Sequence, residues 1–475
     1  MSLNLSDARI TSLTDLWQTT LCGAPSANVN ELFKEHLRIR EALGVNDKEI
    51  FHMHKHIDRK DRAEAVENLP KWLEERGIGH EAVEIRESEF GYGLFAKKDL
   101  EVDDVPIEVP NSATLSLAYG EEKKELRKMH DCDTMLSSMP NVTLAMIVAE
   151  CVLSKDKKFT PYLESLPPSH RTPIFFTVEE LKKLRPSSVF EATLLMFRAI
   201  SRHYVYFCLR VVKDALFLDN VGFKSTYNFR KSPLNSNKFT FDFYRWCVST
   251  VSTRLNNVPT VGYDPERPSP IPTLVPLIDF ANYKSFETNN ASMVYDASSR
   301  MVQLQVKKPI KAGEEIFLHY GNRSNGDFLI HNGFVPQLGN PHDVFEMKLG
   351  FPLSRDCSDE EEFLQLHGVT PDRGVYHFLL DDKTADEKDL AETPLFLFCK
   401  IFVSDDLECI DEVPQKIKAQ KFIVQRLQLL RQAYRDVKQP EGDDILDKFI
   451  FILKTGEIRL LKKFEEKFAA LKFEE

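Results

Sequence analysis

The 475-residue chain lacks the cysteine spacing of a structural metal site. Its eight cysteines include no CxxC pair, and the closest two, Cys399 and Cys409, are ten residues apart. Zinc sites of the finger and ribbon type need such close pairs. The sequence therefore predicts no metal site. It favours buried free thiols in a reducing compartment over a disulfide framework.

Two kinds of apolar segment are also missing. The first residues, MSLNLSDARITSLTDLW, contain no basic stretch followed by an apolar run, so we expect no secretory signal peptide. The most apolar stretch, FIFIL near residue 450, is far shorter than the roughly 20 residues that cross a bilayer. We therefore expect a cytoplasmic protein, with the nucleus as a second compartment, and no membrane partner.

Positive charge is not in excess. The chain has 62 Lys and Arg against 73 Asp and Glu, a net charge of −11. A protein that binds nucleic acid through phosphate contacts needs a basic face, so we expect no nucleic-acid partner. What the chain does contain is typical of a globular protein, with 42% hydrophobic residues and 34 Phe that favour large buried cores. Its length predicts two or three domains.

The spacing of apolar residues divides the chain into three regions. Residues 1–80 show helical spacing, as in NVNELFKEHLRIREAL. Residues 81–340 contain the strands. Residues 341–475 are mainly helical, and the amphipathic segments IKAQKFIVQRLQLLRQAY and ILDKFIFILKTGEIRLLKKFEEKF predict a bundle. The acidic stretches 358–363 and 381–389 are expected to be solvated. The predicted fold class is α+β.

The strands of the middle region come in two separate pieces. The stretch at 82–110 predicts two or three strands joined by tight turns. A helical insertion follows at about 113–240, and FTFDFYRWCVSTVSTRLNNVP (239–259) predicts one more helix, which ends at Pro259. Strands return within 260–335. The two β-rich pieces must meet in space, because neither can bury its apolar face alone.

Four short motifs follow one another along this region. They are FGYGLFA (90–96), TRLN (253–256), LVPLIDFANYKS (274–285), in which an apolar strand runs into Asp279, and LHYG (318–321), which continues into NRSNGDFLIHNGF. Each has an ordinary interpretation when it is taken singly. Gly-x-Gly is typical of a tight turn, an Asn after a strand commonly caps a turn, and Arg254 suits a solvated helix end.

In their order and spacing, however, the motifs resemble those of the SET-domain protein methyltransferases. GYG resembles the first glycine motif of that family, IDFANY its Asn-His motif, and LHYG its catalytic Tyr motif. The helical C-terminal region resembles the substrate-binding domain of the branch that contains plant Rubisco lysine methyltransferases. Within this branch, the chain is most similar to the actin-histidine N-methyltransferases, from about residue 30 to 435. The resemblance implies a β-rich SET domain split by a helical insertion.

The resemblance also implies a cofactor, S-adenosyl-L-methionine, and residues that bind it. The Asn282 amide would donate to and accept from the amino-acid part of the cofactor. An Arg fork would suit a carboxylate or the adenosyl edge. The cofactor-binding residues that the resemblance implies are Arg62, Phe90, Gly91, Tyr92, Arg254, Asp279, Phe280, Ala281, Asn282, Tyr283, Asn332, Gly333 and Phe334.

For the reaction itself, the resemblance assigns catalytic roles to Tyr320 and Asn256. The Tyr320 hydroxyl would orient the methyl group and the attacking nitrogen. Asn256 matches the amide that fixes the tautomer of the target histidine in the actin-histidine enzymes. Histidine is mostly neutral at pH 7, whereas lysine, with a pKa of about 10.4, must first lose a proton. Asn256, Ile278, Tyr320 and Arg323 would contact the substrate, actin.

Two positions depart from the pattern. Ile278 stands where the histidine enzymes carry a Trp against the target ring, which removes a flat wall and enlarges the pocket. Tyr283 stands where the motif normally has His. The first departure supports an alternative, a protein-lysine methyltransferase. The second supports another, a catalytically silent SET-fold binding module.

Overall fold

The computed structural model describes residues 7–122, 134–212, 233–234, 237–259, 270–352, 354 and 356–474. The parts of the predicted helical insertion at 123–133, 213–232 and 235–236 lie outside these residues, as does the stretch 260–269 of the predicted second β-rich piece. Within the described ranges, no helix is both long and apolar enough to cross a membrane. The cysteines in these ranges are free thiols, and five of them are buried.

The helices predicted within the first 80 residues are present. They are α1 (Asp7–Leu16), α2 (Val29–Leu43), α3 (Met53–Ile57) and α4 (Arg62–Glu75). At the start of α2, the Asn28 side chain accepts hydrogen bonds from two backbone N–H groups of the first turn. At its end, Gly44 adopts a φ of 69°, a left-handed conformation that favours glycine. Local sequence thus defines both ends of this helix.

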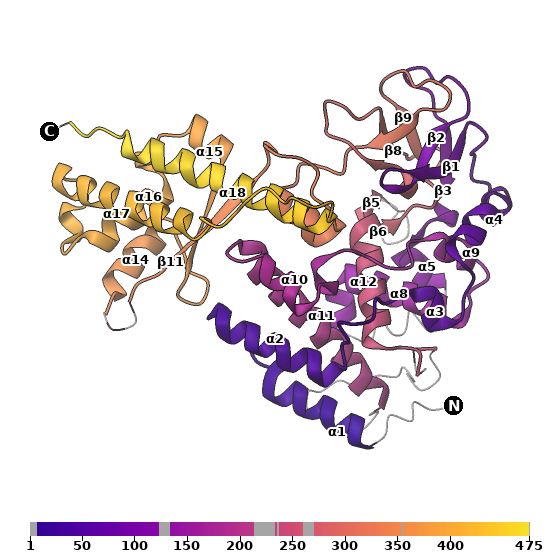
Figure 1. The fold of residues 1–475 in the computed structure, drawn as a ribbon, viewed down its shortest axis with the longest axis horizontal. Coiled ribbons are helices and arrows are strands. Elements are labelled where there is room, and N and C mark those ends of the chain that lie inside the picture. The colour runs from indigo at the N-terminus through magenta and orange to yellow at the C-terminus, as the bar shows by residue number, and fades with distance from the viewer. Residues whose placement is uncertain are drawn as a thin grey trace.

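The two β-rich pieces meet in one seven-stranded sheet, as the sequence predicts (Figure 1). Its main path runs β1-β2-β10-β8-β9-β3, and β7 pairs with β10. The strands are β1 (Val83–Ser88), β2 (Gly91–Ala96), β3 (Ile107–Pro110), β7 (Asn282–Tyr283), β8 (Ala291–Asp296), β9 (Met301–Val306) and β10 (Glu315–Leu318). Residues 91–93 lie inside β2, so the tight turn predicted for Gly-x-Gly is instead made by residues 89–90.

The insertion is helical where the structure describes it, but it begins with a strand that the sequence did not predict. Its helices are α5 (Leu117–Glu122), α7 (Thr134–Ser138), α8 (Pro140–Ser154), α9 (Thr160–Ser165), α10 (Val178–Lys183) and α11 (Ser188–Val212). The strand β4 (Leu115–Ser116) pairs with β6 (Pro270–Leu274) in a second, three-stranded sheet. This pairing connects the insertion to the segment that precedes Asp279.

The prediction of one helix over 239–259 is wrong at its end. The helix α12 (Phe241–Arg254) stops five residues before Pro259, because Leu255 leaves the helical region at ψ 129°. The next residues form β5 (Asn256–Pro259), which pairs antiparallel with β6 from Asn256↔Thr273 to Pro259↔Pro270. A residue before proline disfavours the helical conformation, and this strand pairing favours the extended one. Asn256 therefore lies at the start of a strand.

The strand predicted to run into Asp279 is also shorter than expected. β6 ends at Leu274, and Ile278–Phe280 form a 3-10 turn that follows Leu277. Leu277 has a φ of 70°, which is rare for a residue with a branched side chain. The turn directs the Asp279 side chain inward, where it is 1% exposed.

The region after residue 341 is mainly helical, as predicted. Its longer helices are α14 (Ser358–Leu366), α16 (Pro394–Val403), α17 (Val413–Gln432) and α18 (Ile445–Ala469), and α17 contacts both α16 and α18. A two-stranded sheet of β11 (Val344–Leu349) and β12 (Tyr376–Asp381) was not predicted. Nor are residues 381–389 simply solvated: Asp382 in α15 (Asp382–Glu387) forms ion pairs with Arg459 and Lys463.

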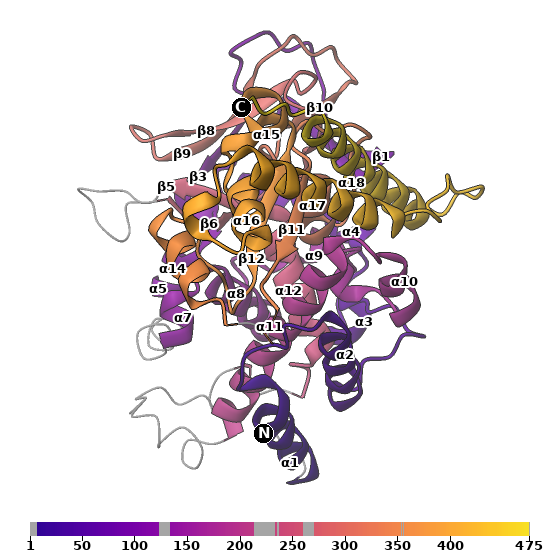
Figure 2. The ribbon, with the colours of Figure 1, turned by 90° about the vertical axis from the view of Figure 1, so that its left-hand side faces the viewer.

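Three hydrophobic clusters hold these parts together. The first spans Leu13 to Leu318, and the second spans Phe345 to Phe468. The third is smaller and joins α2, α10 and α11 to Leu329 and to Leu453 of α18. Figure 1 shows the C-terminal elements at one end of the molecule and the sheet at the other, and Figure 2 shows α16, α17 and α18 facing the viewer. The domain boundary near residue 340 stays a prediction.

A buried carboxyl lies where α18 contacts the start of α11. Glu457 is 4% exposed, and it accepts hydrogen bonds from the Ser187 hydroxyl at 2.7 Å and the Tyr434 hydroxyl at 3.0 Å. Burial raises its pKa to about 7, while the two hydroxyls oppose the rise. A carboxyl whose pKa is higher in the folded state stabilises the fold when protonated, and this contribution is lost as the pH rises through the folded pKa.

We predict that Glu457→Gln removes part of this pH dependence. The amide of the variant cannot ionise, so the variant should gain stability relative to the parent chain between pH 5.5 and pH 8, by roughly 2 kcal/mol. Thermal unfolding at the two pH values measures this change. The matched control is Glu466→Gln on an exposed face of the same helix. An identical pH profile for the parent chain and Glu457→Gln would contradict the prediction.

Candidate active site

A cavity of about 390 Å³ lies where four segments of the fold meet. The segments are the end of α12 with the start of β5, the 3-10 turn after β6, strand β8, and the end of β10 with the residues that follow it. The predicted site residues that line the cavity are Arg254, Asn256, Ile278, Asp279, Ala281, Tyr320, Arg323 and Asn332. The fold thus brings these eight predicted residues together at one cavity. Their roles stay predictions.

Tyr320 lies two residues beyond β10, at the wall of the cavity. Its hydroxyl donates a hydrogen bond of 2.7 Å to the carbonyl oxygen of Ala281, which also lines the cavity. Burial raises the pKa of Tyr320 to about 12. At pH 7 the phenol is therefore protonated, and its position is fixed by the backbone of the 3-10 turn.

Asp279 and Arg254 form a buried pair at one side of the cavity. Arg254 Nη1 donates to the carbonyl oxygen of Asp279 at 2.5 Å and lies 3.6 Å from its carboxylate Oδ2. The Tyr162 hydroxyl donates to the same carboxylate oxygen. Burial raises the pKa of Asp279, while Arg254 and Tyr162 oppose the rise. Asp279 thus has partners from two other parts of the chain, Arg254 of α12 and Tyr162 of α9.

Two atoms of this pair have no hydrogen-bond partner among the described residues. They are Asp279 Oδ1 and Arg254 Nε, and both are buried. A buried polar atom without a partner is costly, and such atoms are commonly satisfied by a bound molecule or water. One acceptor and one donor beside the cavity therefore fit a polar ligand that contains both kinds of group, such as an amino acid.

Arg62 lies at the start of α4, near this pair but not in the lining of the cavity. Its Nε donates to the carbonyl oxygen of Ser165 at 2.9 Å, and its guanidinium lies 4.8 Å from the centre of the Tyr92 ring. Burial and the charge of Arg254 lower the pKa of Arg62 to about 10, so the group stays charged at pH 7. Two buried cations close together favour an anionic ligand.

Asn282 lies on β7 beside the glycine motif. Its Nδ2 donates to Glu315 Oε1 at 2.7 Å and to Ser88 Oγ at 3.2 Å. A Cβ at Gly93 would collide with the Glu315 carboxylate and would lie 2.9 Å from Asn282 Nδ2, so any larger residue there would have to displace these side chains. Phe90, at 63% exposed, lies in the turn before β2, and Gly91 is the first residue of that strand. These residues and Phe280 do not line the cavity.

Tyr283 does not line the cavity, but it packs in a cluster of aromatic rings that includes Tyr320, whose ring centre lies 5.5 Å from its own. Its ring centre lies 4.7 Å from that of Phe328 and 5.8 Å from that of Phe334. Gly333, which directly precedes Phe334, has a φ of 80°. A Cβ at Gly333 would lie 3.1 Å from the backbone of Arg171 and Thr172. Tyr283 therefore fills a packing position, and its departure from the motif removes no side chain from the cavity lining.

Asn256 and Ile278 both line the cavity, and their role in binding the substrate stays a prediction. Asn256 Nδ2 donates to the carbonyl oxygen of Arg254 at 3.1 Å, which fixes the orientation of the amide. Ile278 is fully buried in the wall. Arg323 Nη1 donates to Asn332 Oδ1 at 2.9 Å, so these two predicted residues also contact each other.

Sequence reasoning missed several residues of the site. Phe286, Met293, Leu318 and His319 line the cavity from β8, the end of β10 and the loop before β8. His319 is the one with a sequence signal, because it directly precedes Tyr320. Tyr162 and His170 have no such signal, since they come from the insertion. Burial lowers the pKa of His170 to about 3, and its Nε2 lies 2.9 Å from Thr250 Oγ1.

Comparisons with known proteins agree with this arrangement. Residues 91–321 match the sequence model of the SET domain. An actin-histidine N-methyltransferase of Gallus gallus is 30% identical over 335 residues, which are 70% of this chain and 52% of that protein. That of Homo sapiens is 25% identical over 466 residues, 93% of this chain and 74% of that protein. The chain thus spans about half to three quarters of the length of these relatives.

Solved structures show the same fold. The SET domain of LSMT bound to lysine and AdoHcy has a TM-score of 0.63 at 17% identity, over 86% of this chain and 91% of that chain. Rubisco LSMT bound to AdoMet has a TM-score of 0.62 at 17% identity, over 85% and 91%. The chain therefore has the SET fold.

Proposed function

We propose that the chain is an S-adenosylmethionine-dependent protein methyltransferase that methylates a ring nitrogen of a histidine in actin. The observation that supports this proposal most directly is that the Asn256 amide and the Tyr320 hydroxyl line one cavity with Arg254 and Asp279. The relatives named actin-histidine N-methyltransferase support the acceptor. An actin substrate also agrees with a cytoplasmic location, which we propose with the nucleus as a second compartment.

The cofactor side of the cavity fits the amino-acid part of S-adenosylmethionine. When bound, this molecule supplies a methyl group on a positively charged sulfur. We assign its carboxylate to the cations Arg62 and Arg254, and its ammonium group to the unpartnered Asp279 Oδ1. Asn282 and the aromatic residues Tyr92 and Phe334 would flank it.

The acceptor side suits a neutral imidazole. Because Asn256 Nδ2 donates to the backbone, the amide presents Oδ1 as its acceptor. An imidazole whose N–H donates to Oδ1 keeps its lone pair on the other ring nitrogen, as a nucleophile requires. Tyr320 stays protonated and rigid, so its oxygen can orient the methyl group and the attacking nitrogen. The contribution of the site is mainly one of positioning.

A protein-lysine methyltransferase is the second candidate, and Ile278 favours it. This residue gives the cavity an aliphatic wall where a Trp would place a flat ring against imidazole. The structural neighbour bound to lysine has the same fold. A lysine acceptor must lose a proton before it can attack, and an imidazole-orienting amide contributes little to that step.

We predict methyl transfer from S-adenosylmethionine to one histidine of unmethylated actin by the purified chain. Tyr320→Phe should lower kcat by roughly 100-fold, because the group that orients the reacting atoms is lost. A radiolabel assay followed by mass-spectrometric mapping of the site measures both. Label on a lysine of another protein, with none on actin, would favour the second candidate. Binding of the cofactor without any transfer would favour a silent module.

We further predict that Asn256→Ala lowers kcat/KM for actin by roughly 100-fold and leaves the Kd for S-adenosylmethionine unchanged. The reason is that the tautomer of the acceptor is no longer fixed. Steady-state kinetics and calorimetry measure the two effects. The matched control is Asn257→Ala, which changes the exposed neighbour on the same strand. Equal kinetics of the parent chain and Asn256→Ala would exclude the proposed role of the amide.

A further inference from the structure

The segment that follows Tyr320 connects the cavity to the C-terminal region. Arg323 lines the cavity, and its side chain donates a hydrogen bond to the side chain of Asn332. Two residues later, Asn325 is fully buried and does not line the cavity. A buried Asn must satisfy its amide within the protein, so its partners fix the course of the backbone around Arg323.

The partner of Asn325 is Asp343, at the start of the C-terminal region. The backbone N–H of Asn325 donates to Asp343 Oδ1 at 2.8 Å, and its Nδ2 donates to Asp343 Oδ2 at 3.2 Å and to the carbonyl oxygen of Gln337 at 2.8 Å. Asp343 is 5% exposed. Charge-assisted hydrogen bonds of a buried carboxylate are strong, so this pair is a rigid joint.

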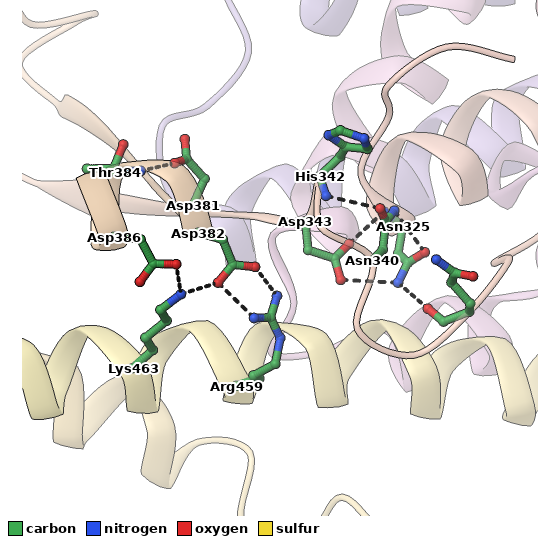
Figure 3. Close-up of polar contacts among 11 residues, drawn as sticks. Asn325, Asn340, His342, Asp343, Asp381, Asp382, Thr384, Asp386, Arg459 and Lys463 are labelled. Atoms are coloured by element: carbon green, nitrogen blue, oxygen red, sulfur yellow. Dashed lines mark hydrogen bonds and ion pairs between the residues drawn. The ribbon is translucent and has the colours of Figure 1, made fainter. Parts of the chain in front are cut away.

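Asn340 extends the joint to Arg323. Its Nδ2 donates to the carbonyl oxygen of Arg323 at 2.8 Å and to Asn325 Oδ1 at 3.3 Å. Its Oδ1 accepts from the N–H of His342 at 3.0 Å. Figure 3 shows the side chains of Asn325, Asn340 and Asp343 turned toward one another. The backbone position of Arg323 therefore depends on that of Asp343.

Helix α18 closely approaches this joint at Gly456. A Cβ at Gly456 would lie 2.6 Å from Asp343 Oδ2, the oxygen that accepts from Asn325 Nδ2. Further along the same face of this helix, Arg459 and Lys463 form ion pairs with Asp382 (Figure 3). A cavity of about 150 Å³ lies beside the contact, lined by residues that include Gly326, Asp343 and Leu453.

We propose that Asn325, Asn340 and Asp343 are positioning residues for Arg323, and that α18, through its close contact at Gly456, sets their geometry. The C-terminal region then controls how firmly the chain binds its acceptor protein, without itself reaching the cavity. The effect on the acceptor rests on the proposed function. The effect on the conformation of residues 321–332 does not.

Gly456→Ala distinguishes this proposal from a merely structural role. Alanine is a better helix former than glycine, so a structural role predicts that the variant stabilises α18. The proposal predicts that the added methyl group displaces the Asp343 carboxylate from Asn325. Amide hydrogen exchange of the full chain, without cofactor or acceptor, should then be roughly tenfold faster in residues 321–332, with α12 unchanged. Unchanged or slower exchange in this segment overturns the proposal.

Kinetics test the link to the acceptor. Gly456→Ala and Asn340→Ala should each raise KM for actin several-fold while kcat and the Kd for S-adenosylmethionine stay constant. In the background of Arg323→Ala, neither should raise KM further, because the residue through which they act is gone. Lys463→Ala, which weakens only the other contact of α18, is the matched control.

Fully additive effects on KM would show that Gly456 and Asn340 do not act through Arg323 and would overturn the proposal. Faster exchange in Gly456→Ala, combined with no transfer to actin by the parent chain, would support the positioning role and count against the proposed acceptor.

Discussion

The antiparallel pairing of β2 with β10 is the constraint on which the site depends. It joins Leu94 to Ile316 and Phe95 to Glu315, across more than two hundred residues of sequence. Since β7 pairs with β10 as well, the same contact places Asn282 beside Gly93. It also places Tyr320, just after β10, against the carbonyl oxygen of Ala281. Without this pairing, the two β-rich pieces would not share one sheet, and the glycine motif would not lie beside Asn282.

A second constraint is the burial of charge next to the cavity. Arg62 and Arg254 are both removed from water, and Asp279 alone does not neutralise them. Buried charges need partners, and here the partners come from α9, α12 and the turn after β6. The insertion supplies Tyr162, whose hydroxyl bonds to Asp279. The insertion is thus part of the site, and the unpartnered atoms of Arg254 and Asp279 mark where a ligand completes the arrangement.

The sequence predicts the fold class, the helical ends of the chain and the eight lining residues that resemble family motifs. It fails where tertiary contacts override local preference. The stretch Asn256–Pro259 has the apolar spacing of a helix end, yet its pairing with β6 makes it a strand. Likewise β4, β11 and β12 are short, and their partners are distant in sequence.

Several residues that sequence reasoning missed have partners that are remote in the sequence. Tyr162 lies 117 residues from Asp279, and Gly456 contacts Asp343 from another region of the chain. Asn325 belongs to the polar stretch that follows LHYG, yet its amide is buried against Asp343. No local pattern distinguishes a solvated Asn from one that bonds across regions, so such contacts emerge only from the structure.

The central claim is that one cavity holds the acceptor imidazole between Asn256 and Tyr320, with the methyl donor on the side of Arg254 and Asp279. A crystal structure of the chain with S-adenosylhomocysteine and an actin peptide that contains the methylated position tests it most directly. The account predicts a ring N–H about 3 Å from Asn256 Oδ1, and the amino-acid part of the cofactor at Asp279 Oδ1. An imidazole bound elsewhere, or a cofactor that does not contact this pair, would contradict it.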